Sequence, residues 1–163
     1  MRSTRGFKSL FRFARNENGG ALAELAILVP FLLVMLGGVA EFGRYFRTYT
    51  TLAKSTRAAA RYLSNVNFDT EHQAAARAMA VCGKTQCAAG EELLIGLDVG
   101  DITVTGDPIS PKPETVTVSV TGFTYDPIFD IGALLHTSFS LAIPVRPSTT
   151  MYHMWQEPTG AED

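Results

Sequence analysis

One acidic residue stands inside the most apolar stretch of the sequence. Between Ala21 and Ala40, Glu24 is the only charged side chain. A carboxylate near the middle of a bilayer costs about 2.5 to 3.5 kcal/mol on insertion scales, so an acid in such a stretch usually has a partner and a function. Two interpretations are open: the side chain reaches back to the headgroups near Arg15, or it meets a positive charge within the apolar layer.

The glycine pair Gly19 and Gly20, just before this stretch, offers such a charge. If the chain is cut between the two glycines, Gly20 gains a free α-amino group and Glu24 becomes the fifth residue of the mature chain. The carboxylate of one subunit can then neutralise the terminal ammonium of a neighbouring subunit, which offsets the desolvation cost of both groups. Such a pair would hold subunits together and would not catalyse a reaction.

The motifs of common enzyme classes are missing from the sequence. The GKT at 83–85 would need a glycine at Ala78 to form a phosphate-binding loop. Ser138 stands near His136, but without the G-x-S-x-G elbow of a hydrolase. Three acids do not follow the order of a calcium-binding loop: Asp98, Asp101 and Asp107. We therefore expect a protein that is not an enzyme, with no cofactor, no metal and no small-molecule substrate.

Two cysteines, Cys82 and Cys87, lie in the segment VCGKTQC. A disulfide between them is the leading interpretation if this part of the chain is exported to an oxidising compartment, and so short a loop would contribute about 2 kcal/mol. A metal site is the weaker alternative. His72 is the only histidine nearby, and a second cysteine pair is missing.

A single long helix, from about Ala21 to about Leu63, is predicted to carry Glu24. Residues 20–41 are expected to span a membrane, because roughly 20 apolar residues at a rise of about 1.5 Å cover the hydrocarbon core of about 30 Å. Residues 42–65 continue the helix outside the membrane. Their apolar side chains recur at helical spacing: Phe42, Tyr45, Phe46, Tyr49, Leu52, Ala53, Thr56, Ala60 and Leu63. Five cations lie mostly on the other side: Arg44, Arg47, Lys54, Arg57 and Arg61.

Charge is divided unequally between the two ends of the chain. Residues 1–19 form a basic leader, whereas from Tyr62 onward four basic and thirteen acidic residues give a net charge of −9. Positive flanks stay in the cytoplasm, so we expect a cytoplasmic N-terminus and an exported remainder. The acidic part is a poor partner for nucleic acid. We hypothesise that the basic helix face docks on the chain's own sheet or on an adjacent subunit.

The exported part is predicted to be an α+β domain over residues 66–147. A short helix is expected after a capping box of Thr70 and Gln73, with Gly83 as its stop. Three runs then alternate with a period of two, which is typical of antiparallel strands in a small sheet: Ile102 and Val104; Val116, Val118 and Val120; Phe139, Leu141, Ile143 and Val145. Pro144 indicates that the last of them is an edge strand. Residues 148–163 have no clear period and are treated as a C-terminal tail.

The stretch from Arg15 to about Leu63 resembles the TadE-like minor pseudopilins of tight-adherence (Flp) pilus systems. The residues that carry the resemblance occur in order: a basic leader, Gly19, Glu24, Pro30 in a "VP" pair, and GGVAEFGRYF, which contains Glu41, Phe42, Gly43 and Arg44. Two departures are Leu25, where the family commonly has an aromatic residue, and Gly20 as the first mature residue.

That resemblance implies a pilin-like fold and a structural function in pilus biogenesis and surface adherence. It makes Gly19 the residue recognised by a prepilin peptidase and Glu24 the assembly residue. The implied partners are the membrane, other pseudopilins or pilus-assembly proteins, and the peptidase. The implied location is the bacterial inner membrane, as a single-pass protein with a periplasmic C-terminal domain, or the pilus itself.

Two other interpretations of the apolar stretch stay open. The small residues of GGVA, ending at Ala40, fit a secretory signal, although the apolar run is longer than such signals usually have and the helical pattern continues beyond the cut. An uncleaved signal anchor would instead hold a periplasmic binding or scaffold protein unrelated to pili. Pro30 and the pair Gly37 and Gly38 either help the helix bend as it leaves lipid or are ordinary membrane-helix residues.

Overall fold

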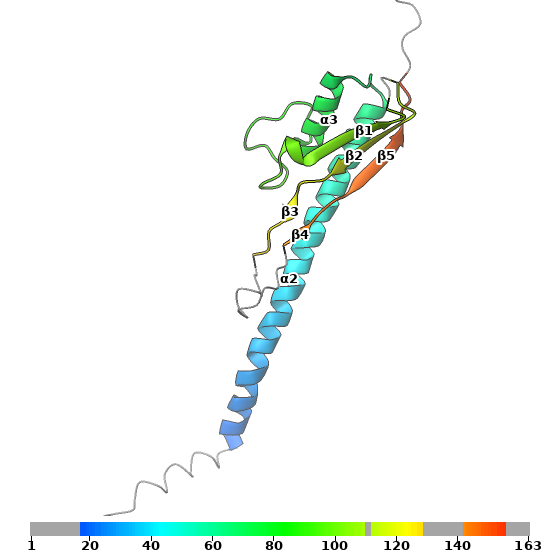
Figure 1. Cartoon of the computed structure of the whole chain (residues 1–163). Helices are drawn as coiled ribbons and strands as arrows, with labels where there is room; N and C mark the ends of the chain where they lie inside the picture. Colours follow the sequence, from blue (N-terminus) through cyan, green and yellow to red (C-terminus); the bar gives the residue numbers. More distant parts are fainter. Residues whose placement is uncertain (1–16, 110–111, 129–141, 156–163) are drawn as a thin grey trace, which may run out of the picture. The chain divides into compact units, whose positions relative to one another are not determined.

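The structure is a computed structural model that describes residues 17–109, 112–128 and 142–155. The chain divides into two units, Met1–Phe42 and Gly43–Asp163. One helix, α2, spans Glu17–Ser64 and contributes to both units (Figure 1). The structure confirms the single long helix and the α+β class that the sequence predicts.

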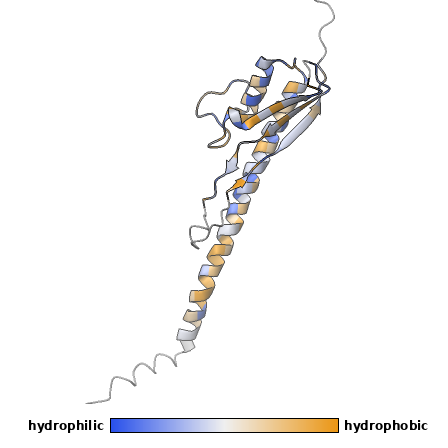
Figure 2. Cartoon of the chain, in the orientation of Figure 1, coloured by the Kyte–Doolittle hydropathy of each residue, from blue (hydrophilic) through white to orange (hydrophobic). Residues whose placement is uncertain are grey.

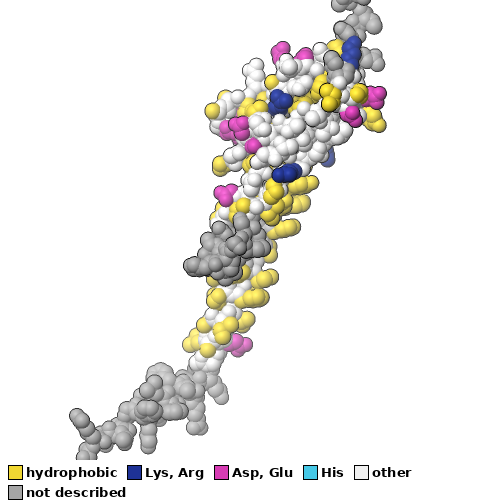
Figure 3. Space-filling view, in the orientation of Figure 1, with side chains coloured by type: hydrophobic (Ala, Val, Ile, Leu, Met, Phe, Trp, Pro, Cys, Tyr) yellow, Lys and Arg dark blue, Asp and Glu magenta, His cyan; other side chains and the backbone are white. Residues whose placement is uncertain are grey.

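In its described residues, the first unit consists of α2 up to Phe42. Its residues are mostly apolar (Figure 2), and hydrophobic side chains lie on its surface (Figure 3); Ile27 is 76% and Leu33 is 58% exposed. The helix is long and apolar enough to cross a membrane, and none of its most apolar 18-residue window is buried. A helix satisfies its backbone hydrogen bonds internally, which is what a segment surrounded by hydrocarbon requires.

The second unit adds short elements to the remainder of α2. They are α3 (Thr70–Cys82), the 3₁₀ turn η1 (Val99–Asp101), β1 (Ile102–Asp107), β2 (Thr115–Val120), β3 (Thr124–Tyr125), β4 (Ile143–Pro144) and β5 (Ser148–Tyr152). The strands β1, β2 and β5 form an antiparallel sheet in the order β1-β2-β5 (Figure 1), and β3 pairs with β4.

The core of this unit lies between one face of the sheet and the helices. Val116 and Val118 of β2 are 0% exposed, as are Leu52 and Leu63 of α2. The predicted period of two is therefore correct for β2, whose alternate residues face the core. Full burial of a Leu or Val side chain contributes about 1.5 to 3 kcal/mol, so these contacts account for much of the stability of the unit.

The N-cap of the short helix α3 lies one residue earlier in the chain than the sequence predicts. Asp69 is the N-cap, and its carboxylate accepts a hydrogen bond of 2.8 Å from the backbone N–H of His72. The predicted cap at Thr70 was therefore wrong, because Thr70 is already the first helical residue. Gly83 does end the helix, with φ of 74°, and its N–H bonds to the carbonyl oxygen of Met79.

The apolar pattern after residue 41 corresponds to two helix faces, not to one. Leu52, Thr56 and Leu63 are 0% exposed, whereas Phe46 is 59% and Tyr49 is 42% exposed. The apolar side chains at helical spacing therefore do not form one buried face, because each step of three residues turns about 60° around the helix and two such steps reach a neighbouring face. The aromatic residues on α2 are thus mostly outside the core.

One strand of the sheet lies where the sequence analysis placed a tail. β5 pairs with β2 over Ser148–Tyr152, so these residues belong to the sheet. In the third predicted run, only β4 and the buried Val145 are described. Phe139 and Leu141 lie outside the described residues. Pro144 is part of a two-stranded sheet, where every strand is an edge, which agrees with the expected edge position.

Candidate functional site

The residues expected to take part in processing lie in the first turns of α2. The helix begins at Glu17, so Gly19, Gly20 and Glu24 are all helical, and Glu24 is exposed. Glu24 follows Gly20 by four residues, which places the two on the same face of the helix, about 6 Å apart along its axis. A positive charge created at Gly20 would therefore lie on the same helix face as Glu24, about one turn away.

Pro30 lies inside α2, and the helix continues through it. Proline has no N–H, so the carbonyl oxygen of Ala26 loses its usual helical partner. Such a free carbonyl is a weak point of the hydrogen-bond ladder. It is compatible with both interpretations of Pro30 offered by the sequence.

The segment EFGR marks the end of the first unit and the start of the second. Glu41 is 7% exposed, whereas Phe42 is 70% exposed. A Cβ atom at Gly43 would meet nothing within 4 Å, so close packing does not explain this glycine. In the second unit, the guanidinium of Arg44 lies 5.8 Å from the centre of the Tyr125 ring, a cation–π contact. Tyr125 also packs edge-on against Tyr45, with ring centres 5.5 Å apart.

Cys82 and Cys87 are joined by the predicted disulfide, with their Cα atoms 5.7 Å apart. The bond ties the C-terminal end of α3 to the loop that follows. On the same loop, Lys84 and Glu91 form an ion pair with Nζ and Oε1 2.8 Å apart. The hydrogen bond from Lys84 lowers the pKa of Glu91. Among the described residues, no group of three or more His, Cys, Asp or Glu could hold a metal ion.

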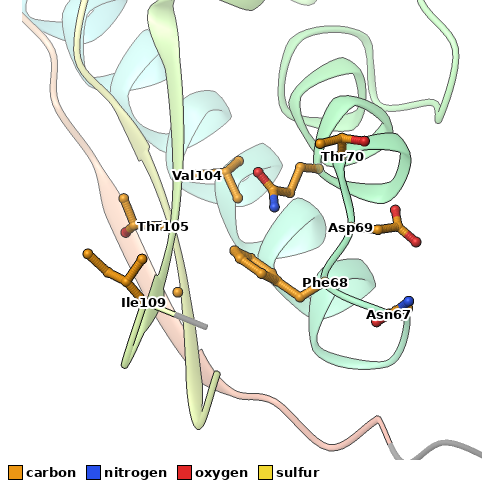
Figure 4. A pocket seen from close by; sticks show the side chains of 9 residues that line it. Asn67, Phe68, Asp69, Thr70, Val104, Thr105 and Ile109 are labelled. Atoms are coloured by element: carbon orange, nitrogen blue, oxygen red, sulfur yellow. The ribbon is translucent and has the colours of Figure 1, made fainter. Parts of the chain in front are cut away.

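A shallow groove of about 710 Å³ lies between the start of α3 and β1 (Figure 4). Phe68, Val104 and Ile109 supply apolar surface, and Asp69 is its acidic residue. Asp69 is already bound to His72, whose Nδ1 lies 2.7 Å from its carboxylate. The backbone hydrogen bond from His72 is the main cause that lowers the pKa of Asp69. The carboxylate is therefore engaged in capping the helix.

Of the five cations expected to dock on the sheet or on an adjacent subunit, Arg44 contacts Tyr125 of β3, whereas the three nearest the end of α2 form no described ion pair with the sheet. Docking on an adjacent subunit stays a prediction. Lys54, Arg57 and Arg61 are exposed, and no described carboxylate forms an ion pair with them. They line an open groove together with residues of β5. Sequence reasoning found the basic face but missed the strand beside it, although Thr149, Thr150 and Tyr152 are residue types that are enriched in strands.

The comparisons with known proteins concern mainly α2. Residues 19–61 match the family model described as "TadE-like protein". This match supports the resemblance inferred from Gly19, Glu24 and the EFGR segment, and it covers about a quarter of the 163-residue chain. No curated protein and no solved structure matches the chain. The likeness therefore rests on the helix, and the domain after it has to be interpreted from its own structure.

Proposed function

We propose that this protein is a minor pseudopilin-like component of a tight-adherence (Flp-type) pilus, inserted in the bacterial inner membrane and processed by a prepilin peptidase. The observation that carries the proposal is the match of residues 19–61 to the TadE-like family model. The matched segment begins at Gly19 and includes Glu24 and the whole apolar part of α2. The proposed processing and assembly residues thus fall inside the matched segment.

The proposed mechanism depends on a charge that cleavage creates. Removal of residues 1–19 leaves an α-amino group on Gly20, one helical turn from Glu24. When two such helices lie side by side in hydrocarbon, the Glu24 carboxylate of one neutralises the amino group of the other. Each group alone would pay a large desolvation cost, so the pair favours helices in this register.

The aromatic residues of α2 support lateral packing beyond the membrane. Phe46 and Tyr49 are exposed on the second unit, at 59% and 42%. Large exposed apolar side chains commonly mark contact surfaces. In this proposal they pack against neighbouring pilus or pseudopilin subunits. The partners are therefore other pseudopilins, the prepilin peptidase and the lipid bilayer, with the Gly43–Asp163 unit in the periplasm.

The substitution Glu24→Gln tests the mechanism in the native host. We expect the variant to reach the membrane fraction in normal amounts, because glutamine is easier to insert than a carboxylate. Surface pili should fall at least tenfold, since the neutral amide no longer compensates the amino group. Glu24→Asp, which keeps the charge, is the matched control and should retain most of the pili. Normal piliation in the Gln variant would contradict the mechanism.

A second candidate function is a periplasmic scaffold or binding protein held by an uncleaved signal anchor. The observation that favours it is the second unit, which has its own core and an open, basic groove. The two functions differ in the phenotype of a strain that lacks the protein. Loss of surface pili supports the pilus component, and normal pili with a changed envelope supports the scaffold.

A further inference from the structure

A groove beside β5, within the Gly43–Asp163 unit, combines an exposed strand edge with a row of cations. It has a volume of about 810 Å³ and lies between the second half of α2 and β5. Lys54, Arg57 and Arg61 line its helical side, and Thr150 and Tyr152 line its strand side. Both strand residues are exposed, Tyr152 at 78%.

The first feature is the free edge of the sheet. β5 is the last strand in the order β1-β2-β5 (Figure 1). Two backbone hydrogen bonds flank the paired strands: Val120 N–H donates to Pro147 O, and His153 N–H donates to Glu114 O. Val120 and Pro147, and Glu114 and His153, are therefore hydrogen-bonded pairs of the β2–β5 ladder. Because such pairs alternate in an antiparallel ladder, the N–H and C=O groups of Thr150 and Tyr152 point away from β2.

The backbone continues this pattern one step beyond the strand. Met154 has the same outward direction as Thr150 and Tyr152, and its N–H bonds to the carbonyl oxygen of Ser64 at 2.8 Å. An outward-pointing N–H of this row therefore forms a hydrogen bond where α2 supplies an acceptor. At Thr150 and Tyr152 no described backbone group bonds to this row. An exposed strand edge of this kind is a template for another strand.

The second feature is a row of cations without acids. Lys54, Arg57 and Arg61 are three and four residues apart, so they share one face and span about 10 Å along the helix. In the described part of the chain, no carboxylate forms an ion pair with these three residues; Asp69 pairs with His72 and Glu91 with Lys84. About three residues of an extended strand cover the same length.

We propose that this groove binds an extended acidic segment of another protein chain, which adds to the sheet as a further strand beside β5. Its backbone bonds to Thr150 and Tyr152, and its carboxylates face Lys54, Arg57 and Arg61. A phosphate or a lipid headgroup would satisfy the cations but not the alternating donors and acceptors of the strand edge. A peptide satisfies both, and strand addition is a common mode of peptide recognition.

This inference does not depend on pilus assembly, because it concerns binding by the second unit alone. The probe is a labelled eight-residue peptide, blocked at both ends, in which Glu alternates with Val and Thr. Its affinity for the full chain in detergent is measured by fluorescence anisotropy. Two related peptides are compared. One has Gln in place of Glu, and the other has alternate backbone amides N-methylated so that it offers β5 no hydrogen-bond donors.

The double substitution Arg57→Gln/Arg61→Gln should weaken binding of the Glu peptide at least tenfold, because charge-assisted hydrogen bonds are lost. Arg47→Gln, an exposed cation of α2 outside the groove, is the matched control and should change binding less than twofold. The Gln peptide and the N-methylated peptide should each bind at least tenfold more weakly than the Glu peptide. Higher salt should weaken binding of the Glu peptide.

Three results would overturn the proposal. Equal binding of the N-methylated peptide would exclude strand addition. An Arg57→Gln/Arg61→Gln variant that binds as well as the unchanged protein would exclude the basic face. A chain ending at Trp155 that binds the probe at least tenfold more tightly than the full chain would show that the acidic residues after it compete for the groove, in place of another protein. We expect equal affinity for the two chain lengths.

Discussion

The two parts of α2 differ in how far their apolar side chains are buried. In the first unit, Leu33 is 58% exposed, and in the second unit Leu63 is 0% exposed. Both are leucines on one continuous helix. The comparison teaches that leucine contributes differently in the two units: in the first it makes the helix apolar enough to cross a membrane, and in the second it packs in the core between helix and sheet.

The largest expected effect separates these two functions directly. Leu63→Ala should lower the free energy of unfolding of the second unit by about 2 to 5 kcal/mol, because it leaves a cavity in a closed core. Leu33→Ala is the matched control and should leave that unfolding unchanged. Urea unfolding of the full chain in detergent, followed by tyrosine and tryptophan fluorescence, measures both. An equal loss in the two variants would contradict the division into units.

The next effect concerns the apolar first part of α2. Leu33→Arg should disfavour membrane insertion by about 2.5 to 3.5 kcal/mol, the cost of an arginine at the centre of a spanning helix. Thr50→Arg, on the second unit, should insert normally. The fraction of protein in carbonate-washed membranes reports the difference. If Leu33→Arg inserts as well as Thr50→Arg, the first part of α2 does not span the bilayer.

Reduction of the disulfide should affect only the second unit. Without the Cys82–Cys87 bond, the unfolded state gains the entropy of a short loop, and the stability of the unit falls by about 2 kcal/mol. Helicity of the first part of α2 in detergent should not change. Unfolding of Cys82→Ser/Cys87→Ser, with the oxidised chain as reference, provides the measurement. Unchanged stability would mean that the loop is held by other contacts.

The smallest effect comes from the capping carboxylate of α3. The pKa of Asp69 is lowered below the ordinary aspartate value of 3.8, so the stabilising contribution of its charge is fully present above about pH 3.8 and is lost as the pH falls through the lowered pKa. Asp69→Asn keeps the cap but cannot titrate. The difference in stability between the two proteins should therefore shrink on acidification below pH 3.8. A constant difference in stability from pH 6 to pH 2.5 would show that the charge of Asp69 does not stabilise α3.

The sequence predicts those parts of the molecule in which local composition decides the structure. The long helix, Gly83 as a helix stop, the strands around Val104 and Val118, and the disulfide are all found. Each depends on a pattern within a few residues, such as an apolar run, a left-handed glycine or a period of two. Glu24 stands out as the acid of an apolar run, whereas the roles of Gly19 and Glu24 follow from the family resemblance and stay predictions.

The sequence did not predict features that depend on distant partners. Whether Phe46 or Leu52 is buried depends on which face of the helix packs in the core with the sheet, and the helical pattern alone contains both faces. β5 itself is short and lies with its exposed residues at an edge, so it lacks a strong apolar alternation. The groove beside Arg57 needs both the helix and this strand. It became visible only when they were placed together.

The mass of the intact protein, purified from its native envelope, tests the central claim most directly. That claim is that α2 is an assembly helix, made competent by a cut between Gly19 and Gly20 that gives Glu24 its positive partner. The account predicts a single mature species that begins at Gly20. A chain that still begins at Met1, or one that begins at Glu41 after a signal-type cut, would contradict it.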